Sequence, residues 1–206
     1  MALNDRDLHA QGKACIKVGQ EEKGNPFFGR YGPMIEDAVT GYADDITALG
    51  SAEAAMRLES DQSRAAFKNL KERMTFQLGM VTIEMPHLDR TSLGDIPGSR
   101  GELLLFADSF IELVEEQGAE LYNREEVLGE MNVLENDART ELGESSDAEE
   151  LFHKAVAQKN ASREKLRTVI RVFKAGARRI HGVDSRQYRT LRDSAFKGKG
   201  GKPKSI

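Results

Sequence analysis

The sequence predicts an all-α protein, a helical bundle of about six helices. Apolar residues recur at steps of three and four along most of the chain, which is the spacing that lines one face of a helix. No stretch alternates apolar and polar residues between turn signals, as a half-buried strand would. The 206 residues are 39% hydrophobic, 6% aromatic and 31% charged. This composition suits amphipathic helices, each of which hides only a narrow apolar stripe.

Two long helices carry the clearest apolar stripes. The first is predicted over residues 51–85 and ends at Pro86, which cannot continue a helix. The second is predicted over residues 146–181, from a Ser-x-x-Glu capping sequence to Gly182. The stripes consist of Phe67, Leu70, Met74, Leu78, Val81 and Met85 in the first helix, and of Leu166, Val169, Ile170, Phe173, Ala177 and Ile180 in the second.

Four shorter helices complete the predicted set, over residues 5–18, 33–50, 99–118 and 123–143. A proline at the first helical position, or Ser or Asn three residues before Glu, marks a helix start, and glycine marks an end. The start signals are Pro33, Ser99 with Glu102 and Asn123 with Glu126, and the end signals are Gly50, Gly118 and Gly143.

The chain also repeats itself with a period near 94 residues. EEKG at residues 21–24 matches EEQG at residues 115–118, and SAEAAMRLESDQSRAAFKNL resembles DAEELFHKAVAQKNASREKL. These matches predict an internal duplication of a three-helix unit, with the two long helices antiparallel. The repeats span residues 1–97 and 98–196 and pack as one domain, followed by a basic, flexible tail at 197–206. The alternative is a pair of unrelated helical hairpins with similar composition.

Residues for catalysis or cofactor binding are scarce. GKGGK near the C-terminus is not a phosphate-binding loop, because Pro203 stands where that motif has Ser or Thr. The lone cysteine, Cys15, has its nearest histidine, His9, six residues away and off the same helical face, so we interpret it as an inert thiol. Glu84 with His87 and Glu150 with His153 have the i, i+3 spacing of metal ligands, but with 34 acidic residues such pairs arise by chance. We therefore expect no catalytic site, no cofactor and no metal.

The chain shows no targeting or membrane signal. Its N-terminus has no apolar stretch after a basic start, no run approaches 18 apolar residues, and a single cysteine forms no internal disulfide. We expect a cytoplasmic protein without membrane contact.

The segment GNPFFGRYGP, residues 24–33, is predicted to be a loop because glycine and proline punctuate it. Its aromatic residues are Phe27, Phe28 and Tyr31. They either close the end of the bundle core or dock a partner, since aromatic residues often anchor interfaces.

Positive charge is concentrated near the C-terminus. Residues 163–206 hold fourteen Lys and Arg against three Asp and Glu, although the whole chain has a net charge of -4. A basic edge follows the last long helix and is continued by the tail. The edge comprises Arg167, Arg171, Lys174, Arg178 and Arg179, and the tail adds Lys197, Lys199, Lys202 and Lys204.

Three interpretations of this polarity compete. The basic edge binds acidic surface of another copy, it binds nucleic-acid phosphates, or it is a solvated helix face. The sequence favours the first: a non-enzymatic structural or scaffolding protein that self-associates, as a homo-oligomer such as a ring or filament. The alternative is a nucleic-acid-binding or accessory protein that uses the basic helix and tail.

Overall fold

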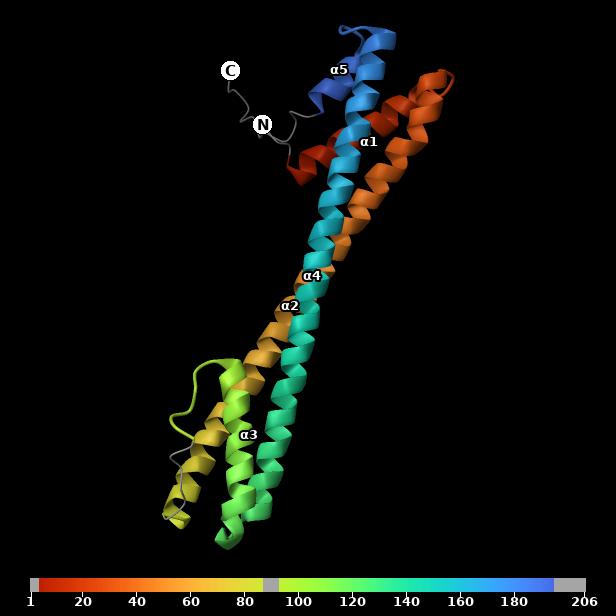
Figure 1. The fold of residues 1–206 in the computed structure, drawn as a ribbon. Helices are drawn as coiled ribbons and strands as arrows, with labels where there is room; N and C mark the ends of the chain where they lie inside the picture. The colour runs from red at the N-terminus through yellow and green to blue at the C-terminus, as the bar shows by residue number, and fades with distance from the viewer. Residues whose placement is uncertain (1–3, 87–92, 195–206) are drawn as a thin grey trace, which may run out of the picture. The chain divides into compact units, whose positions relative to one another are not determined.

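The computed structural model describes residues 4–86 and 93–194. This part of the chain forms five α-helices and a short 3-10 helix, and it contains no strand (Figure 1). The all-α class is therefore confirmed, whereas the count of six helices is not. The elements are α1 (Asp5–Glu21), α2 (Pro26–Glu84), α3 (Arg100–Gln117), η1 (Gly118–Glu120), α4 (Arg124–His181) and α5 (Arg186–Asp193).

Helices α2 and α4 each run through a predicted break. Gly50 and Gly143 were expected to end helices, and that prediction is wrong. A glycine ends a helix efficiently when it adopts positive φ, and among the described residues only Gly94 and Gly182 do so. Ser51 does not cap a new helix either, because its hydroxyl donates to the Thr47 carbonyl oxygen at 3.2 Å. Glycine inside a helix costs about 1 kcal/mol, which the surrounding helix formers tolerate.

Other predicted boundaries are confirmed. Ser99 caps α3, since its side chain accepts a hydrogen bond from the Glu102 backbone N–H and its hydroxyl donates to the Glu102 carboxylate at 2.6 Å. Helix α2 ends at Glu84, shortly before Pro86, and α4 ends at His181, where Gly182 has φ +85°. Asn123 precedes α4 as predicted, but its buried side-chain oxygen accepts no hydrogen bond among the described residues. Helix α5 was not predicted, although Ser185 caps it through the Tyr188 N–H at 3.2 Å.

The chain divides into two compact units. Unit 1 consists of residues 1–52 and 152–206, and unit 2 of residues 53–151. Helices α2 and α4 therefore contribute one segment to each unit. Unit 1 also contains α1 and α5, and unit 2 also contains α3. These bounds describe which residues pack together, and they differ from those of the sequence repeats at 1–97 and 98–196. The repeats describe a duplication of the chain, which stays a prediction.

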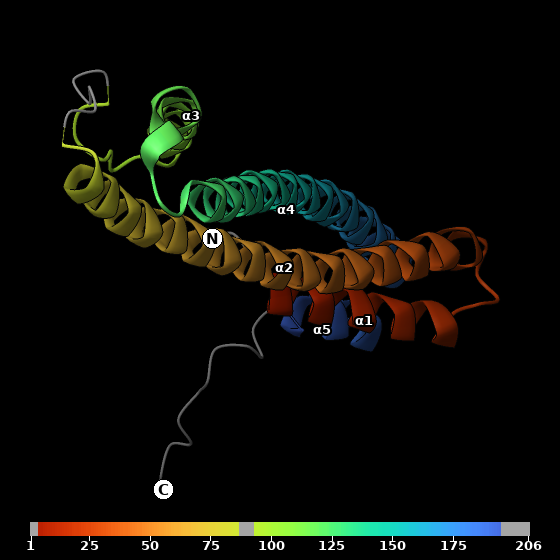
Figure 2. The same ribbon diagram turned by 90° about the horizontal axis from the view of Figure 1, so that it is seen from below.

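In unit 1, helices α1 and α5 lie side by side against the N-terminal segment of α2 and the C-terminal segment of α4 (Figure 2). Helix α1 comes close to α2 at Gly12, where an added Cβ would lie 2.4 Å from a methyl group of Val39. The buried core is Leu8, Cys15, Val18, Phe28, Ile35, Ala38, Val39, Tyr42, Leu166, Ile170, Phe173, Ala177 and Leu191.

In unit 2, α3 packs against the C-terminal segment of α2 and the N-terminal segment of α4. Its core includes the predicted stripe residues Phe67, Leu70, Met74, Val81 and Met85, with Leu78 partly buried. Helix α3 adds a continuous apolar face to this core, and Phe110, one of its two buried phenylalanines, has no exposed surface. The core residues from α3 are Leu103, Leu104, Phe106, Ala107, Phe110, Ile111, Leu113 and Val114.

The helix order bears on the predicted duplication. Helix α1 has 17 residues and precedes α2 with 59, while α3 has 18 residues and precedes α4 with 58. The α2 and α4 segments run antiparallel in each unit. In unit 1, Phe28 meets His181 and Tyr42 lies near Arg163. In unit 2, Ala65 lines a groove with Glu141 and Gln77 bonds to Glu130. The prediction of three helices in each repeat is wrong, because the predicted medium and long helices form one continuous helix, α2 in the first repeat and α4 in the second. The duplication itself stays a prediction.

Candidate functional site

The aromatic segment is helical, so the prediction of a loop at residues 24–33 is wrong. The Asn25 side chain accepts a hydrogen bond from the Phe27 N–H at 3.0 Å, and Pro26 occupies the first helical position, where its missing N–H costs nothing. Pro33 lies inside α2 and not at a helix start. An internal proline costs about 3 kcal/mol. Pro33 is exposed, and burial of the aromatic side chains on the core-facing side of α2 offsets that cost.

The aromatic residues face the core of unit 1. Phe28 is 1% exposed and lies 5.2 Å, centroid to centroid, from the ring of Phe173 on α4. Its other neighbour is the His181 ring, which stacks on it at 5.5 Å. Phe27 and Tyr31 are partly buried, with ring centroids 4.6 Å apart. This geometry favours core closure over partner docking for the three residues.

The basic edge does not form one uniform surface. Arg167 is partly buried and pairs with Glu164 of its own helix at 2.5 Å. Lys174 is partly buried beside Cys15, and burial lowers the pKa of its ammonium group. Arg171, Arg178 and Arg179 are exposed, and none of them forms an ion pair among the described residues. Lys197, Lys199, Lys202 and Lys204 lie outside the described residues.

Cys15 lies in the core of unit 1, beside Lys174. Its side chain is fully buried, and burial raises the pKa of the thiol to about 12. The thiolate is the reactive form, so this shift lowers the reactive fraction about a thousandfold relative to a free cysteine.

We therefore expect Cys15 to react slowly with a disulfide reagent at pH 8 in the native protein, at least about 100-fold more slowly than in denaturant. Stopped-flow absorbance of the released thiol measures both rates. Equal rates in the two conditions would show that the thiol is accessible in the native fold.

The two units carry opposite charge. The described residues of unit 1 hold 17 Lys and Arg against 11 Asp and Glu, a net charge of +6 with histidine neutral. Those of unit 2 hold 8 against 22, a net charge of -14. The polarity predicted from the C-terminal sequence is therefore distributed by compact unit, because the basic segment of α4 and α5 belongs to unit 1.

Sequence reasoning found an acidic excess before residue 163 but did not locate the acidic surface of unit 2 on α3. Residues 100–151 contain three arginines, and each already bonds within the unit. Arg100 donates to the Ser63 hydroxyl at 3.1 Å, Arg124 to the Glu115 carbonyl oxygen at 3.0 Å, and Arg139 to the Asp108 carboxylate at 2.6 Å. The other carboxylates of α3 stay uncompensated by cations among the described residues. The sequence does carry a signal for this acidic surface, because residues 101–117 contain no Lys or Arg.

A polar network joins three helices of unit 1. The Asp5 carboxylate, in the first turn of α1, pairs with Lys159 at 2.6 Å and with Arg163 at 3.4 Å, both on α4. The buried Tyr42 hydroxyl of α2 lies next to it. Lys159 and then Tyr42 lower the pKa of Asp5. The sequence offers no signal for the contact between α1 and α4, because its members lie more than 100 residues apart.

Asp5 gives unit 1 a pH dependence. Because the folded state lowers the pKa of Asp5, its contribution is present above the unfolded pKa of about 3.9 and is lost as pH falls through the lower folded value. We expect Asp5→Asn to unfold at lower urea than wild type at pH 7, and the difference to shrink at pH 2–3. Asp44→Asn, an exposed substitution on α2, is the matched control. A difference that stays constant with pH would contradict the assignment.

Three carboxylates of unit 2 come close enough to hold a cation. One carboxylate oxygen from each of Glu59, Glu141 and Glu144 lies within 4.8 Å of the others. Glu141 also borders an open groove of about 630 Å³ between α2 and α4, which is lined in part by Ala65, Ala66 and Asn69. Sequence reasoning considered Glu–His pairs on one helix and missed this group, which comes from two helices. His87 of the first such pair lies outside the described residues.

Among residues 4–86 and 93–194, no helix combines the length and the apolar character that a membrane span requires. Comparisons with protein-family models, with curated protein sequences and with solved structures found no match.

Proposed function

We propose that this protein is a non-enzymatic structural subunit that self-associates through its oppositely charged units. The observation that carries the proposal is the net charge of the described residues, which is +6 in unit 1 and -14 in unit 2. Complementary potentials steer association and select partners. A surface of one copy that fits a different surface of the next gives a heterologous contact, which closes into a ring or continues as a filament.

The unpaired arginines support this proposal. Arg171, Arg178 and Arg179 have no carboxylate of the described chain to neutralise them, whereas Arg167 does. If carboxylates of the same chain had paired with every cation of the basic edge, no cation would be left for a partner to neutralise. Arg178 and Arg179 also stabilise α4 itself, since cations in the last turn of a helix interact favourably with the helix dipole. Arg171 lies too far from that end to act mainly in this way.

We also propose that α1 with α2, and α3 with α4, descend from one ancestral pair of a short and a long helix. The lengths of 17 and 59 residues against 18 and 58 support this origin, together with the sequence matches.

The test is the molar mass in solution. At micromolar concentration and about 20 mM salt, we expect light scattering to give a mass above that of the 22.9 kDa monomer. At about 500 mM salt the mass falls towards the monomer, because screening shortens the reach of charge. A monomer under both conditions contradicts the proposal.

A second function is supported by the exposed arginines of α5. Arg186, Arg189 and Arg192 are spaced by three residues and lie in the same unit as Arg171. The pairs that Arg189 and Arg192 form with Asp184 and Asp193 are exposed and therefore weak. Such a surface suits nucleic-acid phosphates, and binding that falls steeply with salt in a gel-shift assay tests it.

A further inference from the structure

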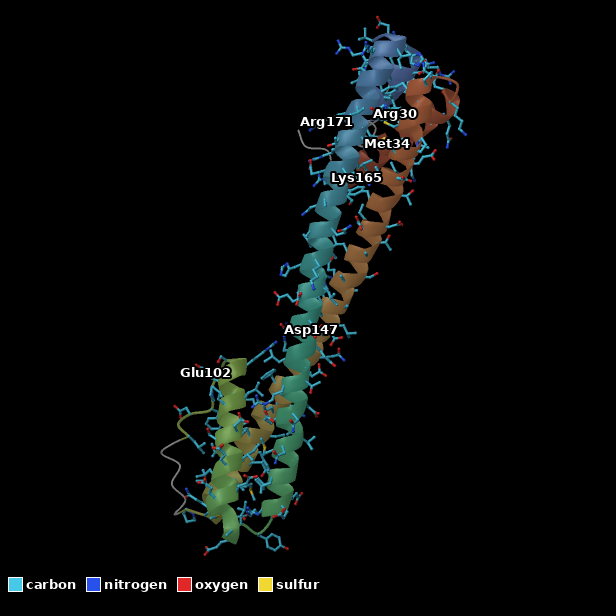
Figure 3. The ribbon with its side chains drawn as sticks, turned by 45° about the vertical axis from the view of Figure 1, so that its right-hand side comes forward. Arg30, Met34, Glu102, Asp147, Lys165 and Arg171 are labelled. Atoms are coloured by element: carbon cyan, nitrogen blue, oxygen red, sulfur yellow. The ribbon has the colours of Figure 1, made fainter. Side chains whose placement is uncertain are left out.

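The outer face of α4 in unit 1 is basic and exposed. We define this basic face by Lys165, Arg171, Val172, Arg178 and Arg179, none of which is covered by the other described elements. At 100° per residue these positions share one side of the helix, opposite to the core residues Leu166, Phe173 and Ala177. Lys165 and Arg171 project from α4 (Figure 3). The acid that precedes this stretch, Glu164, pairs with Arg167, and residues 165–179 contain no Asp or Glu, so the face is positive.

The outer face of α3 in unit 2 has the opposite character. We define this acidic face by Glu102, Leu105, Glu112 and Glu116, all of them exposed. Glu102 stands at the start of the helix (Figure 3). Leu105 is 66% exposed, which is unusual for so large an apolar side chain among charged neighbours. No cation of the described residues pairs with Glu112 or Glu116.

The two faces also agree in length and apolar content. Lys165 and Arg179 are fourteen positions apart, as are Glu102 and Glu116, which is about 21 Å of helix in each case. Each face has an aliphatic side chain among its charges, Val172 at 38% and Leu105 at 66% exposure. A contact between them would bury both aliphatic groups inside a charged rim, as interfaces commonly do.

We propose that the basic face of α4 in one copy docks on the acidic face of α3 in a second copy. The inference rests on the proposed self-association and specifies its surfaces. Charge complementarity selects a second copy as the occupant, since the same chain provides both faces.

Charge reversal on each face tests the docking. The basic variant is Lys165→Glu with Arg171→Glu, which avoids the last turn of α4 and its dipole. The acidic variant is Glu112→Lys with Glu116→Lys, which leaves the Ser99–Glu102 cap intact. In either variant alone, like charges face each other across the contact. We expect the dissociation constant from sedimentation velocity at low salt to rise at least about tenfold.

Mixing the two variants supplies the decisive measurement. The reversed α4 of one variant then meets the reversed α3 of the other, and the two unaltered faces also match. We expect an equimolar mixture to recover the wild-type mass, although each variant alone does not. Matched controls alter the same charges elsewhere, with Lys13→Glu and Lys17→Glu on α1 or Asp137→Lys and Asp147→Lys on α4. They keep the wild-type mass, and circular dichroism checks that all variants remain helical.

The remaining outcomes separate this docking from the proposed function. If wild type associates and both face variants associate equally well, the docking is wrong while self-association stands. If wild type is a monomer at every salt concentration, the proposed function fails and the docking with it. If the basic variant loses nucleic-acid binding in a gel shift but keeps the wild-type mass, the occupant of the basic face is nucleic acid and the docking is overturned.

Discussion

Gly176→Ala is expected to destabilise unit 1 strongly. A Cβ at position 176 of α4 would lie 1.9–2.6 Å from three ring atoms of Phe27, far inside van der Waals contact. The ring is held by Phe28 and Tyr31, whose centroids lie 5.3 and 4.6 Å away, so it moves only by losing those contacts. Overpacking of this kind costs about 1–3 kcal/mol. Urea unfolding followed by circular dichroism measures the change.

A matched glycine and a second substitution show that the clash is the cause. Gly41 on α2, also in unit 1, has room for a methyl group, because a Cβ at that position would meet nothing within 4 Å. Helical Gly→Ala there stabilises by about 0.5–1 kcal/mol. In a Phe27→Ala background, Gly176→Ala should cost much less than in wild type, because the ring that it meets is gone. If the two substitutions are additive, the contact between Phe27 and position 176 is not what destabilises the variant.

The helical class was predictable because it depends on local spacing. The stripes at Phe67, Leu70 and Met74, and at Leu166, Ile170 and Phe173, are buried as the sequence indicates. The number of helices could not be predicted, because glycine and serine end a helix only in particular backbone conformations. Gly182 has positive φ and ends α4, whereas Gly50 and Gly143 stay helical, and the residue type is the same in all three.

The candidate surfaces were predictable in sign but not in detail. The excess of Lys and Arg after residue 163 predicts a basic pole, and the described residues of unit 1 carry a net positive charge. Which members of the basic edge face solvent depends on α1, which brings Cys15 next to Lys174 across 159 positions of sequence. Neither that contact nor the clustering of Asp5 with Lys159 has a local sequence signal. Long-range contacts of this kind decide which charges stay available.

The aromatic residues show how tertiary packing overrides local signals. Glycine and proline at positions 24–33 argue for a loop, yet Asn25 and Pro26 start a helix and the rings at 27, 28 and 31 follow its period into the core. If Phe28 served to anchor a partner, removing it would weaken association and leave the fold of the isolated chain intact. If it closes the core, the free energy of unfolding must fall.

Phe28→Ala is expected to lower the free energy of unfolding by about 3–5 kcal/mol, the usual cost of deleting a buried aromatic ring. The substitution removes the ring contacts with Phe173 at 5.2 Å and with His181 at 5.5 Å, and it leaves a cavity at the end of the α2–α4 pair in unit 1. Urea unfolding at high salt measures this cost, because self-association through charge is suppressed there.

Tyr122→Ala is the control for Phe28→Ala. It also deletes an aromatic ring, but Tyr122 is 98% exposed, so we expect a change within about 0.5 kcal/mol. Equal and small effects of the two substitutions would contradict core closure and return Phe28 to the surface available for a partner. A large effect at Phe28 alone assigns this residue to holding α2 against α4 in unit 1, and contact residues are then to be sought among the exposed charges of α3, α4 and α5.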